Sequence, residues 1–207
     1  MSGEFRGAGT GPKTVLRGMM LLALGRREGI ECFRATPDAF LAALAPGIAL
    51  NLVSLVISLM QHGRGIALTR VALSFCALLG PPVVSHMMAR FWKREEQWLR
   101  YATAAAWCEW VTVLVTVMAL LMAALIMPSL AHQPAFGKAL MVTTELYGVW
   151  LGWFVARIGL GIGAGKALLL YAMTVLFVVG CYALASVVPP HHAYIMDLFK
   201  PVMFGKS

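Results

Sequence analysis

Four charged side chains lie inside otherwise apolar stretches of this chain: Arg70, Glu109, Glu145 and Arg157. A charge in hydrocarbon is costly, so such residues are rare, usually paired and often part of an ion or substrate path. Depth in the membrane can be counted from the ends of the apolar stretches at ~1.5 Å per helical residue. From one side, Glu109 lies ~12 Å deep and Arg157 ~9 Å deep. From the other side, Arg70 lies ~6 Å deep and Glu145 ~9 Å deep. We therefore predict two charge pairs, Glu109–Arg157 and Arg70–Glu145, which either clamp helices together or line a transport path. The clamp is favoured, because near the midplane we find only the uncharged Asn51.

Two of the apolar stretches carry small or polar residues at helical spacing. In a membrane such residues face neighbouring helices, whereas large apolar ones face lipid. The first stretch has an interior polar stripe made of Asn51, Ser54 and Ser58, which continues the spacing of Gly47. The fourth has a flat helix-packing face made of Gly148, Gly152, Ala156, Gly159 and Gly163.

Motifs for catalysis or cofactor binding fail on detail. The glycines from Gly159 to Ala167 resemble a phosphate-binding loop, but Leu160 and Ala167 stand where that motif requires Gly and Ser or Thr. Cysteines and histidines lack the spacing of metal ligands, and no haem-type histidine pair lies within the stretches. The sequence therefore predicts no catalytic, cofactor-binding or metal-binding residue, and we expect a protein that is not an enzyme.

Five apolar stretches must position these residues. A hydrocarbon core of ~30 Å needs roughly 20 apolar helical residues, and each stretch is that long. The composition agrees, with 60% hydrophobic and 13% charged residues. The sequence predicts an all-α, polytopic transmembrane helical bundle with five membrane spans. The stretches are Ala39–Met60, Ile66–Ala89, Tyr101–Met127, Ala139–Gly163 and Ala167–Val188.

The basic residues predict the topology. The net charge of +8 lies next to the spans, which argues for anionic lipid rather than nucleic acid as the partner. Lys and Arg gather before the first span and in the loop Arg90–Arg100, so we expect these parts and the N-terminus in the cytoplasm and the C-terminus outside. Without a cleavable targeting signal, a bacterial cytoplasmic (inner) membrane is favoured. The predicted regions are a basic N-terminal tail (1–38), a five-helix transmembrane domain (39–188) and a short extracytoplasmic tail (189–207).

Local signals refine this outline. Val15–Leu24 is apolar with basic neighbours, as in a segment that lies flat at the cytoplasmic interface. Thr36-Pro37-Asp38 is typical of a helix start. Pro81-Pro82 is expected to kink or break the second span.

Three segments resemble the Yip1-domain family of five-span membrane proteins. They are Phe33–Phe40, Tyr101–Trp110 and Tyr147–Ala167, and the likeness covers about Phe33–Val188. The resemblance implies a non-enzymatic bundle with a cytoplasmic N-terminus. Eukaryotic members of that family act in vesicle trafficking with small GTPase partners, and the family supplies no catalytic residues.

These features favour a Yip1-like scaffold or accessory subunit of a membrane complex. Its partners would be membrane lipid and either another protein or further copies of the chain. Its interaction surfaces would be the packing face of the fourth span and the loop Arg90–Arg100. The alternative is a small transporter or channel for an ion or small molecule that uses the four charges in the spans.

Overall fold

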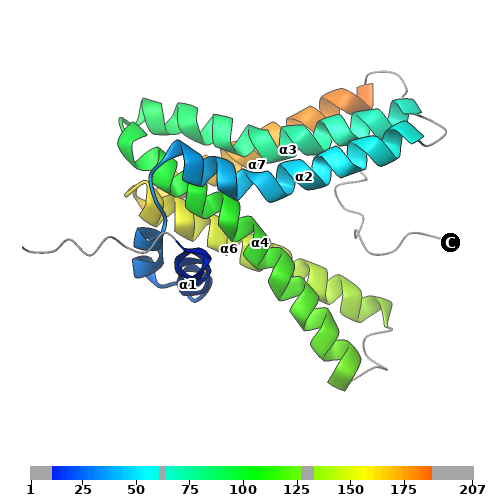
Figure 1. Ribbon diagram of the computed structural model, residues 1–207, viewed down its shortest axis with the longest axis horizontal. Helices are drawn as coiled ribbons and strands as arrows, with labels where there is room; N and C mark the ends of the chain where they lie inside the picture. Colours follow the sequence, from blue (N-terminus) through cyan, green and yellow to red (C-terminus); the bar gives the residue numbers. More distant parts are fainter. Residues whose placement is uncertain (1–10, 61–63, 127–132, 188–207) are drawn as a thin grey trace, which may run out of the picture. The chain divides into compact units, whose positions relative to one another are not determined.

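A computed structural model of the protein describes residues 11–60, 64–126 and 133–187, and this part of the chain is all helical (Figure 1). Five of its helices are long and apolar enough to cross a membrane. The predicted all-α class with five candidate spans is therefore confirmed, whereas the side of the N-terminus stays a prediction. The elements are α1 (Pro12–Ala23), η1 (Arg27–Cys32), α2 (Pro37–Met60), α3 (Arg64–Phe91), α4 (Glu95–Ile126), α6 (Pro134–Gly159) and α7 (Ala164–Val187).

The helix ends follow local chemistry. The expected start of the first span is confirmed, because α2 begins at Pro37 and the Thr36 hydroxyl accepts a hydrogen bond from the Ala39 N–H at 3.3 Å. The fourth span begins and ends earlier than predicted, since α6 runs from Pro134 to Gly159 and does not reach Gly163. Gly161 adopts φ 60°, and the Ile162 N–H donates to the Arg157 carbonyl at 3.1 Å. This Schellman-type end needs a residue with positive φ, which glycine supplies most cheaply.

The proline pair does not break the second span. α3 runs from Arg64 to Phe91 with Pro81 and Pro82 inside it. Each proline removes one backbone N–H donor, a loss that membrane helices tolerate where side chains and neighbouring helices satisfy the freed groups. Next to the pair, the Ser85 hydroxyl donates to the Pro82 carbonyl at 2.9 Å.

The chain divides into two compact units. Unit 1 comprises Met1–Ala43 and Glu96–Ala167, and therefore holds α1, η1, nearly all of α4, and α6. Unit 2 comprises Leu44–Glu95 and Leu168–Ser207, and therefore holds most of α2, all of α3 and most of α7. The predicted tail 189–207 lies outside the described residues.

Helix α3 of unit 2 packs on both α2 and α7 through glycines. A Cβ atom at Gly47 of α2 would lie 2.8 Å from Cδ1 of Leu78, and one at Gly80 would meet the ring of Phe177 in α7. The predicted polar stripe of α2 starts beside Gly47, because the Asn51 side-chain amide donates to the Gly47 carbonyl at 2.9 Å. Farther along, Ser54 is exposed and Ser58 is half-buried.

The packing of α3 on α7 predicts that two thiols can be cross-linked. Cys76 and Cys181 are each four residues from the Gly80–Phe177 contact, so the antiparallel register of α3 and α7 places the two side chains at one level. Both are free thiols. We expect a short bifunctional thiol reagent to link them within one molecule, because the register of α3 on α7 brings the two thiols to the same level. Peptide mass spectrometry would detect the link; Cys76→Ser should abolish it, and a linkage of Cys76 to Cys32 instead would contradict the packing.

Candidate functional site

Unit 1 is built on an antiparallel pair formed by α4 and α6. A Cβ atom at Gly148 would lie 3.4 Å from Cγ2 of Thr112, and one at Gly159 would lie 3.0 Å from Cβ of Tyr101. The two contacts are 11 residues apart on both helices (112 − 101 and 159 − 148), so the register is constant between them. Two members of the predicted packing face, Gly148 and Gly159, are thus occupied by α4 of the same chain.

This register gathers four tryptophans at one level of the pair. Trp107 of α4 lies level with Trp153 of α6, and Trp110 lies level with Trp150. Tryptophan is enriched where the bilayer meets water. From Trp107 to Ile126, α4 offers about 20 residues, which is the length that crosses a hydrocarbon core of ~30 Å. We name these four residues the tryptophan belt, and its level fits a membrane interface.

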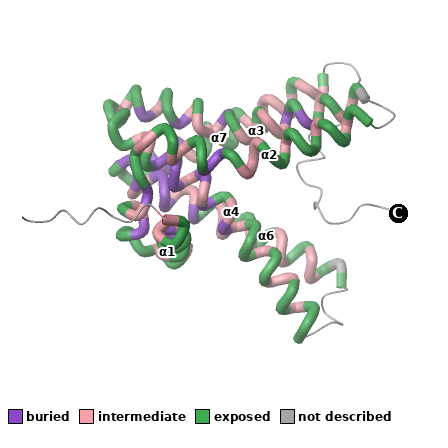
Figure 2. The backbone as a smooth tube through the Cα atoms, viewed as in Figure 1, coloured by how far each residue is buried: buried purple, intermediate pink, exposed green. Residues whose placement is uncertain are grey.

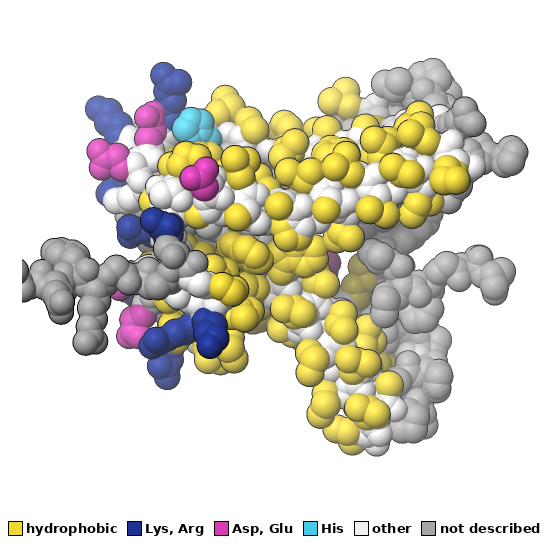
Figure 3. Space-filling model, viewed as in Figure 1, with side chains coloured by type: hydrophobic (Ala, Val, Ile, Leu, Met, Phe, Trp, Pro, Cys, Tyr) yellow, Lys and Arg dark blue, Asp and Glu magenta, His cyan; other side chains and the backbone are white. Residues whose placement is uncertain are grey.

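The protein core of unit 1 lies at the belt and on one side of it. Tyr101, Ala104 and Cys108 of α4 are buried, as are Val155 and Ala156 of α6. Beyond the belt, toward Ile126 and Pro134, both helices are largely exposed, as the green part of the tube in Figure 2 shows. In the space-filling view that half presents a mostly hydrophobic surface (Figure 3). An apolar surface of this kind suits contact with lipid chains.

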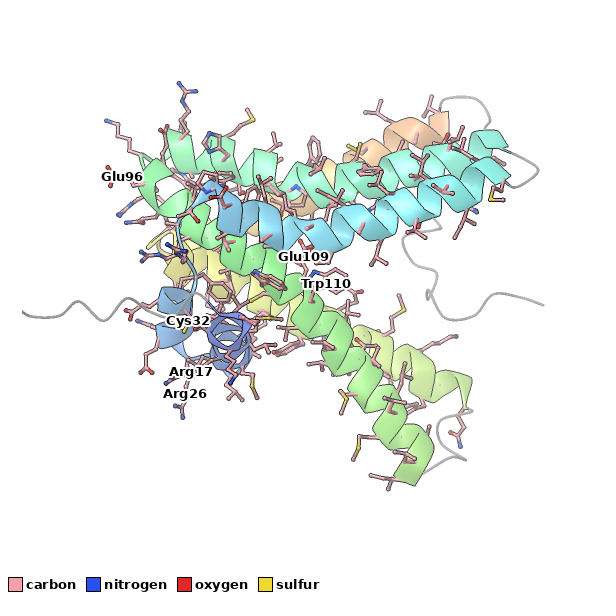
Figure 4. All side chains as sticks on the ribbon, viewed as in Figure 1. Arg17, Arg26, Cys32, Glu96, Glu109 and Trp110 are labelled. Carbon is pink, nitrogen blue, oxygen red and sulfur yellow. The ribbon has the colours of Figure 1, made fainter. Side chains whose placement is uncertain are left out.

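Helix α1 and η1 form a cap against α6 (Figure 4). The Tyr147 hydroxyl donates to the Ala23 carbonyl at the end of α1 at 3.0 Å. Gly25 turns the chain with φ 73°, and a Cβ atom there would lie 3.2 Å from the ring of Trp150. The predicted flat segment Val15–Leu24 is therefore mostly helical, and its C-terminal end meets the belt.

Glu109 lies between the two belt tryptophans of α4. Its side chain is exposed, and its carboxylate makes no hydrogen bond or ion pair with any residue that the structure describes. Val113 and Val117, one and two turns farther on, are also exposed. We name Glu109, Val113 and Val117 the Glu109 face. On such a face the carboxylate can accept a hydrogen bond from a partner, while the two valines pack against an apolar helix.

The predicted pair Glu109–Arg157 does not form an ion pair in the described part of the chain. The register sets Glu109 level with Leu151, and the six residues from there to Arg157 amount to ~9 Å of helix. Arg157 lies over the ring of Trp153 instead, with its guanidinium carbon 5.6 Å from the ring centroid. A cation over an aromatic face is a favourable arrangement that needs no carboxylate.

The second predicted pair joins different units. Arg70 belongs to unit 2 and Glu145 to unit 1, and both side chains are exposed. Their pairing, and the choice between a structural and a transport role for the four charges, stay predictions. No group of three or more metal-ligating side chains occurs among the described residues.

The sequence alone did not reveal the belt, because its four members come from two distant segments. The signal was present as two pairs of tryptophans three residues apart, Trp107 with Trp110 and Trp150 with Trp153. Only the antiparallel register brings the two pairs to one level.

Fold and site together define an all-helical protein with five candidate membrane spans, which fits an integral membrane protein in contact with lipid. No family model, curated protein or solved structure matches the chain.

Proposed function

We propose that the protein is a non-enzymatic scaffold or accessory subunit of a membrane complex, and that it binds its partner through the Glu109 face. The observation that carries this proposal is the carboxylate of Glu109, an exposed residue on an apolar helix, which has no partner among the described residues. Charged groups at such positions usually pair or serve a function. The partner would be a transmembrane helix that offers a basic side chain or another strong hydrogen-bond donor near the interface.

The packing of α6 supports the choice of this face. Gly148 and Gly159 already contact α4, so part of the small-residue face of α6 is occupied inside unit 1. The Glu109 face remains exposed on the same unit. The resemblance to the Yip1-domain family favours a role of the same kind. The basic residues before the first span favour a cytoplasmic N-terminus.

The test is affinity capture of the tagged full-length protein in native nanodiscs, read by mass spectrometry. We expect Glu109→Gln to lose a stoichiometric partner that the wild type retains, with binding weakened at least about tenfold, because truncating a desolvated charge pair is costly. Glu96→Gln is the matched control, since Glu96 is an exposed glutamate at the start of the same helix. Recovery of the wild type alone, or retention of the partner by Glu109→Gln, would contradict the proposal.

The same carboxylate favours a second candidate, a small ion or small-molecule transporter. A carboxylate within an apolar span suits proton or cation coupling. In this case purified protein in liposomes would carry a flux with no partner present, and Glu109→Gln would abolish that flux. A scaffold would carry none, so the two experiments separate the two functions.

A further inference from the structure

Helix α1 has two apolar sides, and only one of them packs against other described residues. The used side holds Gly18, Met19 and Leu22, which are buried. A Cβ atom at Gly18 would lie 2.8 Å from both Cβ of Cys32 and the ring of Phe33, so α1 sits tightly on the segment that follows it. The cap is therefore a packed part of unit 1 with a defined outer side.

The outer side of α1 carries a second apolar stripe. Leu16, Met20 and Leu24 follow one another at intervals of four residues and are 56%, 69% and 73% exposed. Residues four apart lie on one helix face, so the three side chains form a continuous strip. Water is a poor environment for such a strip, and its spacing suits a helix that rests on a membrane surface.

Basic residues accompany this strip. Lys13 precedes Leu16 by three residues, Arg17 precedes Met20 by three, and both are exposed. Arg26 and Arg27 follow α1 and are exposed as well. The two acidic residues of the cap, Glu28 and Glu31, belong to η1 and not to α1. Long basic side chains beside an apolar strip can reach lipid phosphates while their stems stay in the apolar layer.

The position of the cap supplies the second argument. Gly25, one residue after Leu24, adjoins Trp150 of the tryptophan belt. The belt fits the level at which lipid headgroups begin. The apolar strip and the basic residues of α1 are thus held at headgroup level by the packing of unit 1.

We propose that the outer side of α1 is a membrane-surface site for anionic lipid, in which Leu16, Met20 and Leu24 enter the interface and Lys13 and Arg17 bind lipid phosphates. The site is separate from the Glu109 face. Headgroup binding adds to the packing that holds α1 on α6, so the stability of the docked cap depends on lipid charge.

Hydrogen–deuterium exchange of the full-length protein tests the proposal, in nanodiscs of zwitterionic lipid and in nanodiscs with about 30% anionic lipid. We expect the backbone amides of residues 13–24 to exchange roughly tenfold more slowly with anionic lipid. Each basic residue near an anionic surface favours binding several-fold, and bound α1 opens less often. Lys13→Gln combined with Arg17→Gln should remove the dependence on lipid charge. Both residues are exposed, so the fold should persist.

A matched control removes the same number of positive charges at another place in the chain. Lys93→Gln combined with Arg94→Gln alters two exposed basic residues outside the cap and should leave the lipid dependence of 13–24 intact. Equal exchange of the wild type in both lipids would overturn the proposal and leave the strip to a protein partner. Persistence of the lipid dependence in the Lys13 and Arg17 double variant would overturn it too.

Discussion

Replacement of Gly159 by leucine is expected to destabilise unit 1 by about 2–3 kcal/mol, the usual cost of forcing extra atoms into a packed core. A Cβ atom at Gly159 would lie 3.0 Å from Cβ and 3.2 Å from Cα of Tyr101. Both residues are buried, and the opposing atoms belong to or adjoin the backbone, so no side-chain rotation relieves the contact. Thermal unfolding in detergent, followed by tryptophan fluorescence, would show a midpoint several degrees below that of the wild type.

Gly165→Leu is the matched control for this substitution. Gly165 lies near the start of α7, is exposed, and has no atom within 4 Å of a would-be Cβ. Because leucine favours helix more than glycine does, the control should unfold at the wild-type temperature or slightly above it. A Gly159→Leu protein as stable as the control would show that the register of α4 on α6 is wrong, and with it the level of the belt.

The five long helices follow from the sequence because the signal is local. A run of about 20 apolar residues indicates a candidate span wherever it packs. The ends of the helices were harder to predict from the sequence, because each end depends on the backbone conformation of a single residue. The end at Gly159 rests on the positive φ of Gly161 and on the bond from Ile162 to Arg157. In a row of closely spaced glycines, composition does not reveal which one adopts that φ.

Depth in the membrane could not be read from hydropathy for a physical reason. Helix α4 has 32 residues, or ~48 Å, and is longer than a hydrocarbon core. Its segment from Tyr101 to Cys108 is largely apolar because it packs in the core of unit 1, where Tyr101, Ala102 and Ala104 are buried. Its last part is apolar and exposed. Burial in protein and contact with lipid select the same residue types, so a count from Tyr101 sets Glu109 ~12 Å deep, whereas a count from the belt sets it at the interface.

The same ambiguity explains why Glu109 and Arg157 were predicted to pair. Similar depths predicted a pair of Glu109 with Arg157, but each depth was counted from the end of an apolar stretch, and the observed helices α4 and α6 end elsewhere. With the Arg157 guanidinium over Trp153, the cation has an aromatic partner and Glu109 is available to other groups. An exposed carboxylate beside the belt and a lipid-binding strip on α1 would together place recognition of both protein and lipid at one interface.

The position of Glu109 at the level of the belt predicts a large difference in the reactivity of cysteines introduced along α4. We expect a cysteine at position 109 to react with a water-soluble, membrane-impermeant maleimide roughly 100-fold faster than a cysteine at position 117, because the reactive thiolate is scarce in hydrocarbon. Glu109 and Val117 are exposed on the same face of α4 and differ by two helical turns, or ~12 Å of depth. Peptide-resolved mass spectrometry on sealed vesicles separates Glu109→Cys and Val117→Cys from the four native cysteines.

Gln97→Cys sets the rate for full exposure to water, since Gln97 is exposed near the start of α4 and lies on the belt side that carries the core. A rate at position 109 close to that of position 97 would place the carboxylate at the interface, within reach of a partner helix whose basic side chain or other donor lies at headgroup level. A rate as slow as that of position 117 would place it in hydrocarbon. There an unpaired carboxylate is costly, so the balance would move from the scaffold toward the transporter.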